Sequence, residues 1–181
     1  MHLKYILIAI FLISSICSIG SVENNLTAQF TPPKDWRFAE IEALPKHVHV
    51  MVVGKGDYPF PPSINLGTEL YAGTLAEYLQ IVKAINDADG AEWKNLGTIE
   101  TEAGPANLSQ VDSSTEWGKV RMMHVILLKE GTAYILTAAA LCKEFSKFYP
   151  QFFRSMKTLR LIPSIVKNEN EKERGAIKSV G

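Results

Sequence analysis

The chain has 181 residues, 46% of them hydrophobic, which is enough for one ordinary hydrophobic core but hardly for two. Lys and Arg together number 19, as do Asp and Glu, so the net charge is zero. This balance gives no sign of the basic character that is typical of nucleic-acid-binding proteins, and we expect no nucleic-acid partner.

The N-terminus, residues 1–20, has the pattern of a secretory signal peptide. Lys4 supplies a positive charge, and an unbroken apolar run follows from Tyr5 to Ile13. The small residues Ser18 and Gly20 occupy the third and first positions before a cut, so cleavage is predicted after Gly20. The mature chain is therefore expected outside the cytoplasm, in the periplasm or secreted.

Two alternatives to cleavage remain open. Residues 5–20 could stay as a membrane anchor, although their second half is rich in serine. Cys17 could carry a lipid, since a cysteine just after the apolar run is where a bacterial lipoprotein is modified, but Ser14-Ser15-Ile16 fits that signal poorly. We expect contact with a membrane only through this signal or such a lipid anchor.

The remainder is predicted to form one domain over residues 30–162. Residues 21–29 are polar and predict a short tether. Residues 163–181 are dense in Lys, Glu, Asn and Arg, and predict a charged, disordered tail.

The first half of the domain predicts three strands, a proline-rich loop and a helix. The strand-like runs lie at 38–43, 47–53 and 63–71. Between the last two, Pro59-Phe60-Pro61-Pro62 predicts an extended, exposed and stiff loop. A helix is predicted from Thr74 to Gly90, with Thr74 and Glu77 forming a capping box.

The second half predicts four strands and a second helix. The strands lie at 96–102, 106–112, 117–128 and 132–139, and a Gly-containing turn over 129–131 joins the last pair into a hairpin. A helix is predicted over 143–159, kinked or divided by Pro150. Strands, helix, four strands and helix in this order predict an α+β fold with a mostly antiparallel sheet.

This order of elements resembles the superfamily that groups the photosystem II protein PsbP with the Ran-binding Mog proteins and bacterial envelope proteins such as DcrB. Pro33-Lys34-Asp35-Trp36, Pro61-Pro62-Ser63-Ile64-Asn65 and Trp117-Gly118 are the pieces that suggest it, and the likeness covers roughly Phe30 to Ile162. The resemblance implies a small exported member with a sheet of about six to seven strands and helices on both faces, a three-layer α/β/α arrangement. It also implies a non-enzymatic binding or accessory module, with no functional residue to carry over.

Candidate chemical residues are few. His47 and His49 are two apart on a predicted strand and could chelate a metal, but two ligands do not make a site; His124, a possible third, is predicted as a hydrogen-bonded core histidine. Cys142 has an apolar context and no neighbouring base, and Glu40, Glu42 and Glu69 are expected to face water. We therefore expect no catalytic residue, no cofactor and no enzymatic activity.

The proline-rich loop is the candidate binding element, through Tyr58, Phe60, Pro61 and Pro62. A stiff, exposed loop can present aromatic rings to a partner at a low entropic cost. The alternative is that the rings fold back over the sheet edge. The sequence thus predicts an exported, non-catalytic accessory protein whose partner is another envelope protein, with a small-molecule or metal-binding periplasmic protein, or a hydrolase, as the alternative.

Overall fold

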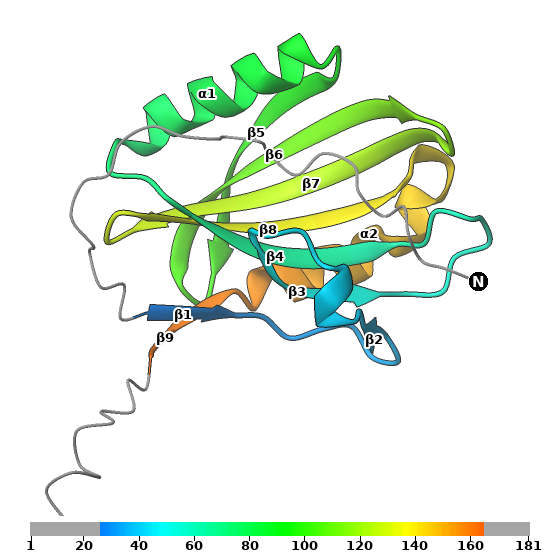
Figure 1. Ribbon diagram of the computed structural model, residues 1–181, viewed down its shortest axis with the longest axis horizontal. Coiled ribbons are helices and arrows are strands. Elements are labelled where there is room, and N and C mark those ends of the chain that lie inside the picture. Colours follow the sequence, from blue (N-terminus) through cyan, green and yellow to red (C-terminus); the bar gives the residue numbers. More distant parts are fainter. Residues whose placement is uncertain (1–25, 165–181) are drawn as a thin grey trace, which may run out of the picture.

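The computed structural model describes residues 26–164. Figure 1 shows its elements, which are β1 (Leu26–Gln29), β2 (Arg37–Phe38), the 3-10 helix η1 (Ile41–Ala43), β3 (Val48–Val53), β4 (Ser63–Leu70), α1 (Leu75–Ala88), β5 (Glu92–Thr101), β6 (Gly104–Thr115), β7 (Gly118–Lys129), β8 (Thr132–Leu141), α2 (Cys142–Lys157) and β9 (Arg160–Pro163). The signal peptide 1–20, the anchor alternative 5–20 and the lipidation alternative at Cys17 lie outside the described residues and stay predictions.

Seven strands form one sheet in the order β2-β3-β4-β8-β7-β6-β5, and every neighbouring pair is antiparallel. This confirms the predicted mostly antiparallel sheet. At its centre, β7 and β8 form the hairpin that was predicted at 129–131, with Lys129 opposite Thr132. The two turn residues, Glu130 and Gly131, have φ angles of 50° and 70°, the left-handed conformation that a tight hairpin turn requires.

A second, two-stranded sheet joins the two ends of the described chain. β1 pairs with β9, from Leu26 opposite Pro163 to Gln29 opposite Arg160, and Leu26 and Ala28 pack against the main hydrophobic core. Residues 26–29 of the predicted tether are therefore a strand. The prediction of a tether was wrong for these residues, because their partner strand lies at the other end of the domain. Sequence patterns over a few residues do not reveal such a distant pairing.

α2 buries a stripe of aromatic side chains against one side of the sheet. Phe145, Phe148 and Phe152 belong to the same buried cluster as Val125 of β7 and Leu136 of β8. In Figure 1, α2 (orange) lies on the far side of the strands from α1 (green). This cluster is the main core of the domain.

α2 continues through Pro150 as one helix, so the division that the sequence offers as one outcome there does not occur. Proline has no N–H to donate to the carbonyl four residues earlier, which belongs to Ser146. Both Ser146 and Pro150 are exposed, so water can hydrate that carbonyl. The aromatic stripe on the opposite side of the helix holds it in place.

α1 begins with the predicted capping box. The Glu77 N–H donates to Thr74 Oγ1 (3.3 Å) and the Thr74 N–H donates to Glu77 Oε2 (2.8 Å). Tyr78 and Val82 of α1 form a second buried cluster with Ile126 of β7, and thus belong to a different cluster from the α2 stripe. Neither helix within residues 26–164 has the length and apolar character needed to cross a membrane.

The strand predicted over 38–43 is mostly not a strand. Of residues 38–43, only Phe38 belongs to a strand, β2. The chain then turns into η1, where the Ala43 N–H donates to the Glu40 carbonyl (3.1 Å). The alternation of apolar and acidic residues suggested a strand. The Leu44 N–H also donates within this turn, to the Ile41 carbonyl (3.0 Å), and Pro45 comes next, which has no N–H and cannot extend a ladder of hydrogen bonds.

Candidate functional site

The proline-rich loop, residues 54–62, connects β3 to β4 and is closed at its base. The Gly54 N–H donates to the Pro62 carbonyl (2.8 Å). The indole of Trp36 lies so close to Gly54 that a Cβ atom there would be 2.5 Å from Trp36 Cε2. Trp36 in turn packs edge-on against Phe148 and Phe152 of α2, with ring centroids 6.3 and 5.9 Å apart. The base of the loop is thus fixed to the main core.

The first two turns of α2 hold the tip of the loop. The Asp57 N–H donates to Glu144 Oε1 (2.9 Å), and Lys147 Nζ forms an ion pair with Asp57 Oδ2 (2.7 Å). Lys143 Nζ lies 3.2 Å from the centre of the Tyr58 ring, a cation–π contact. A hydrogen bond, an ion pair and a cation–π contact therefore attach Asp57 and Tyr58 of the loop to α2.

Glu144 is the central residue of this attachment. It is only 4% exposed, and its second oxygen, Oε2, has no hydrogen-bond partner among the described residues. A carboxylate in the first turn of a helix is favoured by the helix dipole, which offsets part of the cost of burying it. Gly56 lies beside this carboxyl group and leaves room for Pro62, because a Cβ atom at position 56 would lie 2.9 Å from Pro62 Cδ.

The structure separates the four residues predicted to bind a partner. Phe60 is buried against Trp117, with ring centroids 5.7 Å apart, so this ring folds back over the end of the sheet. Pro62 is buried and Pro61 is half-buried. Tyr58 alone presents an aromatic ring, with 43% of its surface exposed. The sequence reasoning missed Glu144, whose acidic character near a helix start was the only sign of its role.

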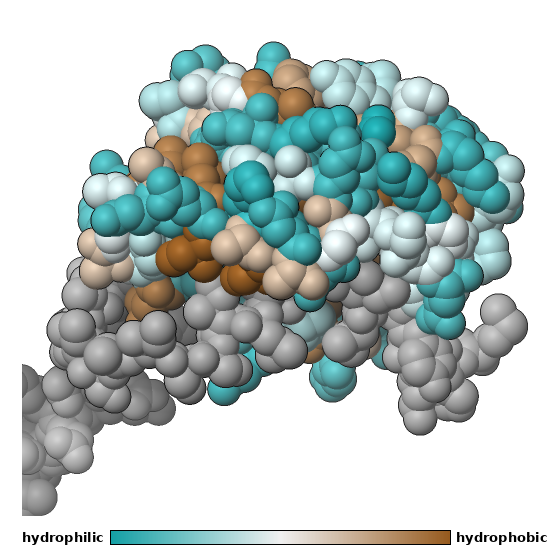
Figure 2. Space-filling model, turned by 90° about the horizontal axis from the view of Figure 1, so that it is seen from above, coloured by the Kyte–Doolittle hydropathy of each residue, from teal (hydrophilic) through white to brown (hydrophobic). Residues whose placement is uncertain are grey.

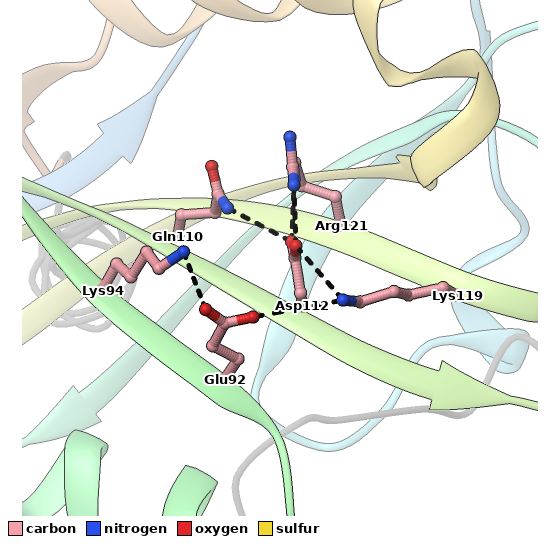
Figure 3. Close-up of polar contacts among 6 residues, drawn as sticks. All are labelled: Glu92, Lys94, Gln110, Asp112, Lys119 and Arg121. Carbon is pink, nitrogen blue, oxygen red and sulfur yellow. Dashed lines mark hydrogen bonds and ion pairs between the residues drawn. The ribbon is translucent and has the colours of Figure 1, made fainter.

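A network of charged and polar side chains lies near the start of α2, on β5, β6 and β7 (Figure 3). Asp112 accepts two hydrogen bonds from Arg121, through Nε and Nη2, both of 2.7 Å. These bonds hold the pKa of the Asp112 carboxyl below its usual range. The guanidinium of Arg121 also lies 5.6 Å from the ring centre of Phe145 in α2. The outer members of the network are Glu92, Lys94, Gln110 and Lys119.

Cys142 begins α2 beside this network and is half-buried. Burial raises the pKa of its thiol, which favours the protonated form. This agrees with the predicted interpretation of Cys142 as a small packing residue.

The histidines do not come together. His47 is exposed before β3, and His49 Nε2 is hydrogen-bonded to Thr68 Oγ1 (2.6 Å). His124 is buried and its Nδ1 is hydrogen-bonded to Thr137 Oγ1 (3.0 Å), which confirms the predicted core histidine. Within residues 26–164 no group of three His, Cys, Asp or Glu side chains is placed to hold a metal ion.

The predicted carboxylates do not form a cluster either. Glu69 accepts a hydrogen bond from the hydroxyl of Tyr78 in α1 (2.7 Å), while Glu40 and Glu42 are exposed beside η1. Burial raises the pKa of the Tyr78 hydroxyl, which therefore stays protonated and able to donate. These groups serve packing and solvation.

Comparison with known proteins gives structural likeness only. No protein-family model matches the sequence, and the search of curated proteins finds no match. LpqN of Mycobacterium tuberculosis, which is involved in cell envelope biogenesis, is similar with a TM-score of 0.55 and 19% identity, over 76% of this chain and 84% of LpqN. PA94 of Pseudomonas aeruginosa, a protein of unknown function, has a TM-score of 0.51 and 12% identity, over 71% of this chain and 99% of PA94.

The PsbP of the cyanobacterium Synechocystis sp. PCC 6803 is also found, with a TM-score of 0.48 and 10% identity, over 83% of this chain and 99% of that protein. The fold is shared with LpqN and PA94. At these identities the likeness concerns the fold alone.

Proposed function

We propose that the chain is an extracytoplasmic accessory protein of the cell envelope, which binds another envelope protein through the loop 54–62 and catalyses no reaction. The observation that carries this proposal is the attachment of the loop to α2 by Glu144, Lys147 and Lys143, with Tyr58 left exposed at its tip. A binding element that is already ordered loses little conformational entropy on association. Tyrosine is also among the residues that contribute most to protein interfaces.

The location in the envelope rests on two lines of support. The pattern of residues 1–20 is that of a secretory signal. LpqN, a neighbour in fold, is involved in cell envelope biogenesis. Cell fractionation, with mass spectrometry of the N-terminus, tests this part: we expect a mature chain that begins at Ser21, and a cytoplasmic chain that retains Met1 would contradict the proposal.

We also infer the three-layer α/β/α arrangement for this domain. Successive residues of a strand point to opposite faces of a sheet. Ile126 of β7 packs in the cluster of α1, whereas its neighbour Val125 packs in the cluster of α2. The two helices therefore lie on opposite faces, and the loop 54–62 lies at the end of the sheet where α2 begins.

Site-specific photo-crosslinking tests the binding surface directly. A photoreactive phenylalanine analogue is placed at Tyr58, and in a matched control at Tyr149, which is also exposed (44%) but belongs to α2, where its ring stacks on Phe153. In intact cells we expect one reproducible crosslinked protein from position 58 and none from position 149. Absence of a product at position 58, or the same products at both positions, would refute the proposal.

A further inference from the structure

A row of polar side chains crosses the side of the sheet on which α1 packs. The strand register pairs Asn95 with Ser109, Ser109 with His124, His124 with Thr137, and Thr137 with Asn65. Directly opposite residues of antiparallel strands project from the same face. These five residues, here called the polar row, therefore form one line over β5, β6, β7, β8 and β4.

The polar row lies between two apolar clusters. On one side Met122 packs in the cluster that contains Phe60, and on the other side Ile126 packs in the cluster beneath α1. Trp93 of β5 contacts both clusters. Figure 2, seen from above, shows the outer surface of the molecule, where scattered apolar residues (brown) lie among hydrophilic ones (teal). Apolar surface with a few polar groups at defined positions is typical of small-molecule binding sites.

Three buried polar atoms on this side have no hydrogen-bond partner among the described residues. They are Trp93 Nε1, Ser109 Oγ and Asn107 Oδ1. Ser109 is 0% exposed and Asn107 is 7% exposed. Asn107 lies two residues from Ser109 along β6, and Trp93 pairs with Val111, two residues from Ser109 in the other direction. Buried polar atoms are nearly always paired in folded proteins. The indole N–H of Trp93, the amide oxygen of Asn107 and the hydroxyl of Ser109 lie on adjacent strands. Because all three lack a hydrogen bond, they indicate a hydrogen-bonding partner that is not among the described residues.

Among the described residues, the five members of the polar row carry no charge that would suit an ion. The polar row consists of neutral side chains, and burial keeps His124 neutral by lowering its pKa to about 4. The nearest acidic group on this face of β4, Glu69, already accepts the hydroxyl of Tyr78. An ion placed here would lose its hydration without gaining an opposite charge.

We propose that the polar row binds a small uncharged amphipathic molecule. Its hydroxyl or amide groups meet Trp93 Nε1, Ser109 Oγ and Asn107 Oδ1, and its apolar part packs on the two flanking clusters. One of the flanking clusters includes Phe60 of the loop 54–62, but the hydrogen-bonding atoms lie on β5 and β6, whereas Tyr58 contacts α2. The two proposals are tested on different residues, so either can fail without the other.

Tryptophan indole resonances provide the test, because Trp93 Nε1 is one of the three atoms. The full chain, labelled with nitrogen-15 in tryptophan, is titrated with octanamide and 1,2-octanediol, which are neutral, and with octanoate and octylammonium, which are charged and have the same chain length. The Trp93 resonance is assigned with Trp93→Phe. We expect a saturable shift of the Trp93 resonance, larger than that of Trp36, with the neutral compounds only.

Ser109→Ala should weaken this binding about three- to tenfold, the usual effect of one lost hydrogen bond. Ser114→Ala, on the same strand but exposed, is the matched control and should bind as the wild type does. No shift of Trp93 with either neutral compound would mean that the row holds ordered water only and would overturn the proposal. Binding of the charged compounds as strong as that of the neutral ones would also overturn it. This comparison uses the wild type alone, so it remains valid if Ser109→Ala does not fold.

Discussion

Replacing Glu144 by alanine should release the tip of the loop 54–62 from α2. The variant removes a hydrogen bond from the Asp57 N–H to a buried carboxylate (2.9 Å), an interaction worth about 1.5–3 kcal/mol. Part of this loss is offset, because the buried Oε2 atom, which has no partner among the described residues, is removed as well. We expect a net loss of about 1 kcal/mol, confined to the loop. Glu144→Gln keeps an oxygen acceptor without the charge and should retain the loop.

Amide hydrogen exchange at Asp57 measures this effect. A loss of about 1 kcal/mol should speed the exchange of the Asp57 N–H about fivefold in Glu144→Ala, with little change in amides of β7 and β8. Lys147→Ala, which removes only the exposed ion pair to Asp57, serves as the control and should change the rate less. Unchanged exchange at Asp57 in Glu144→Ala, or an equally large effect of Glu144→Gln, would refute the reasoning.

Two further predictions concern the stability of the whole domain, measured by urea unfolding. Gly54→Ala should destabilise it by about 1–3 kcal/mol, because a Cβ there would lie 2.5 Å from the fixed ring of Trp36. Gly73→Ala should do less, since the atom it meets is the movable end of the Tyr71 side chain; equal effects would contradict this explanation. The second prediction is that stability falls as the pH drops from about 6.5 towards 4, since burial lowers the pKa of His124 from 6.5 to about 4 and the unfolded chain takes up the proton first. The loss amounts to about 3 kcal/mol in total, and a His124→Asn variant with the same pH slope would disprove the assignment.

Local signals in the sequence predicted much of the fold. The capping box of Thr74 and Glu77 and the hairpin turn of Glu130 and Gly131 depend on residues close together in the chain, and both are present. The aromatic stripe of α2 also follows from helical spacing, which requires no knowledge of the partner strands. Pro150 does not divide the helix, because its missing hydrogen bond falls on the exposed side.

The candidate site could be predicted only in part. The proline pattern indicated a stiff loop, but its attachment depends on Glu144, which is 87 residues away from Asp57 in the sequence. Likewise, the burial of Phe60 against Trp117 depends on how distant segments pack. The polar row depends on strand register: His124 and Ser109 become neighbours only once β6 and β7 pair, and the sequence does not state that pairing.

Quantitative recovery of the partner tests the central claim most directly. The full chain is isolated from chemically crosslinked envelopes as the wild type, as Tyr58→Ala and as Tyr149→Ala, and the recovered proteins are quantified. We expect one partner to be recovered with the wild type and with Tyr149→Ala, and its recovery to fall at least about tenfold with Tyr58→Ala, as for a central interface tyrosine. Equal recovery of the partner with all three chains would contradict a function based on the loop 54–62.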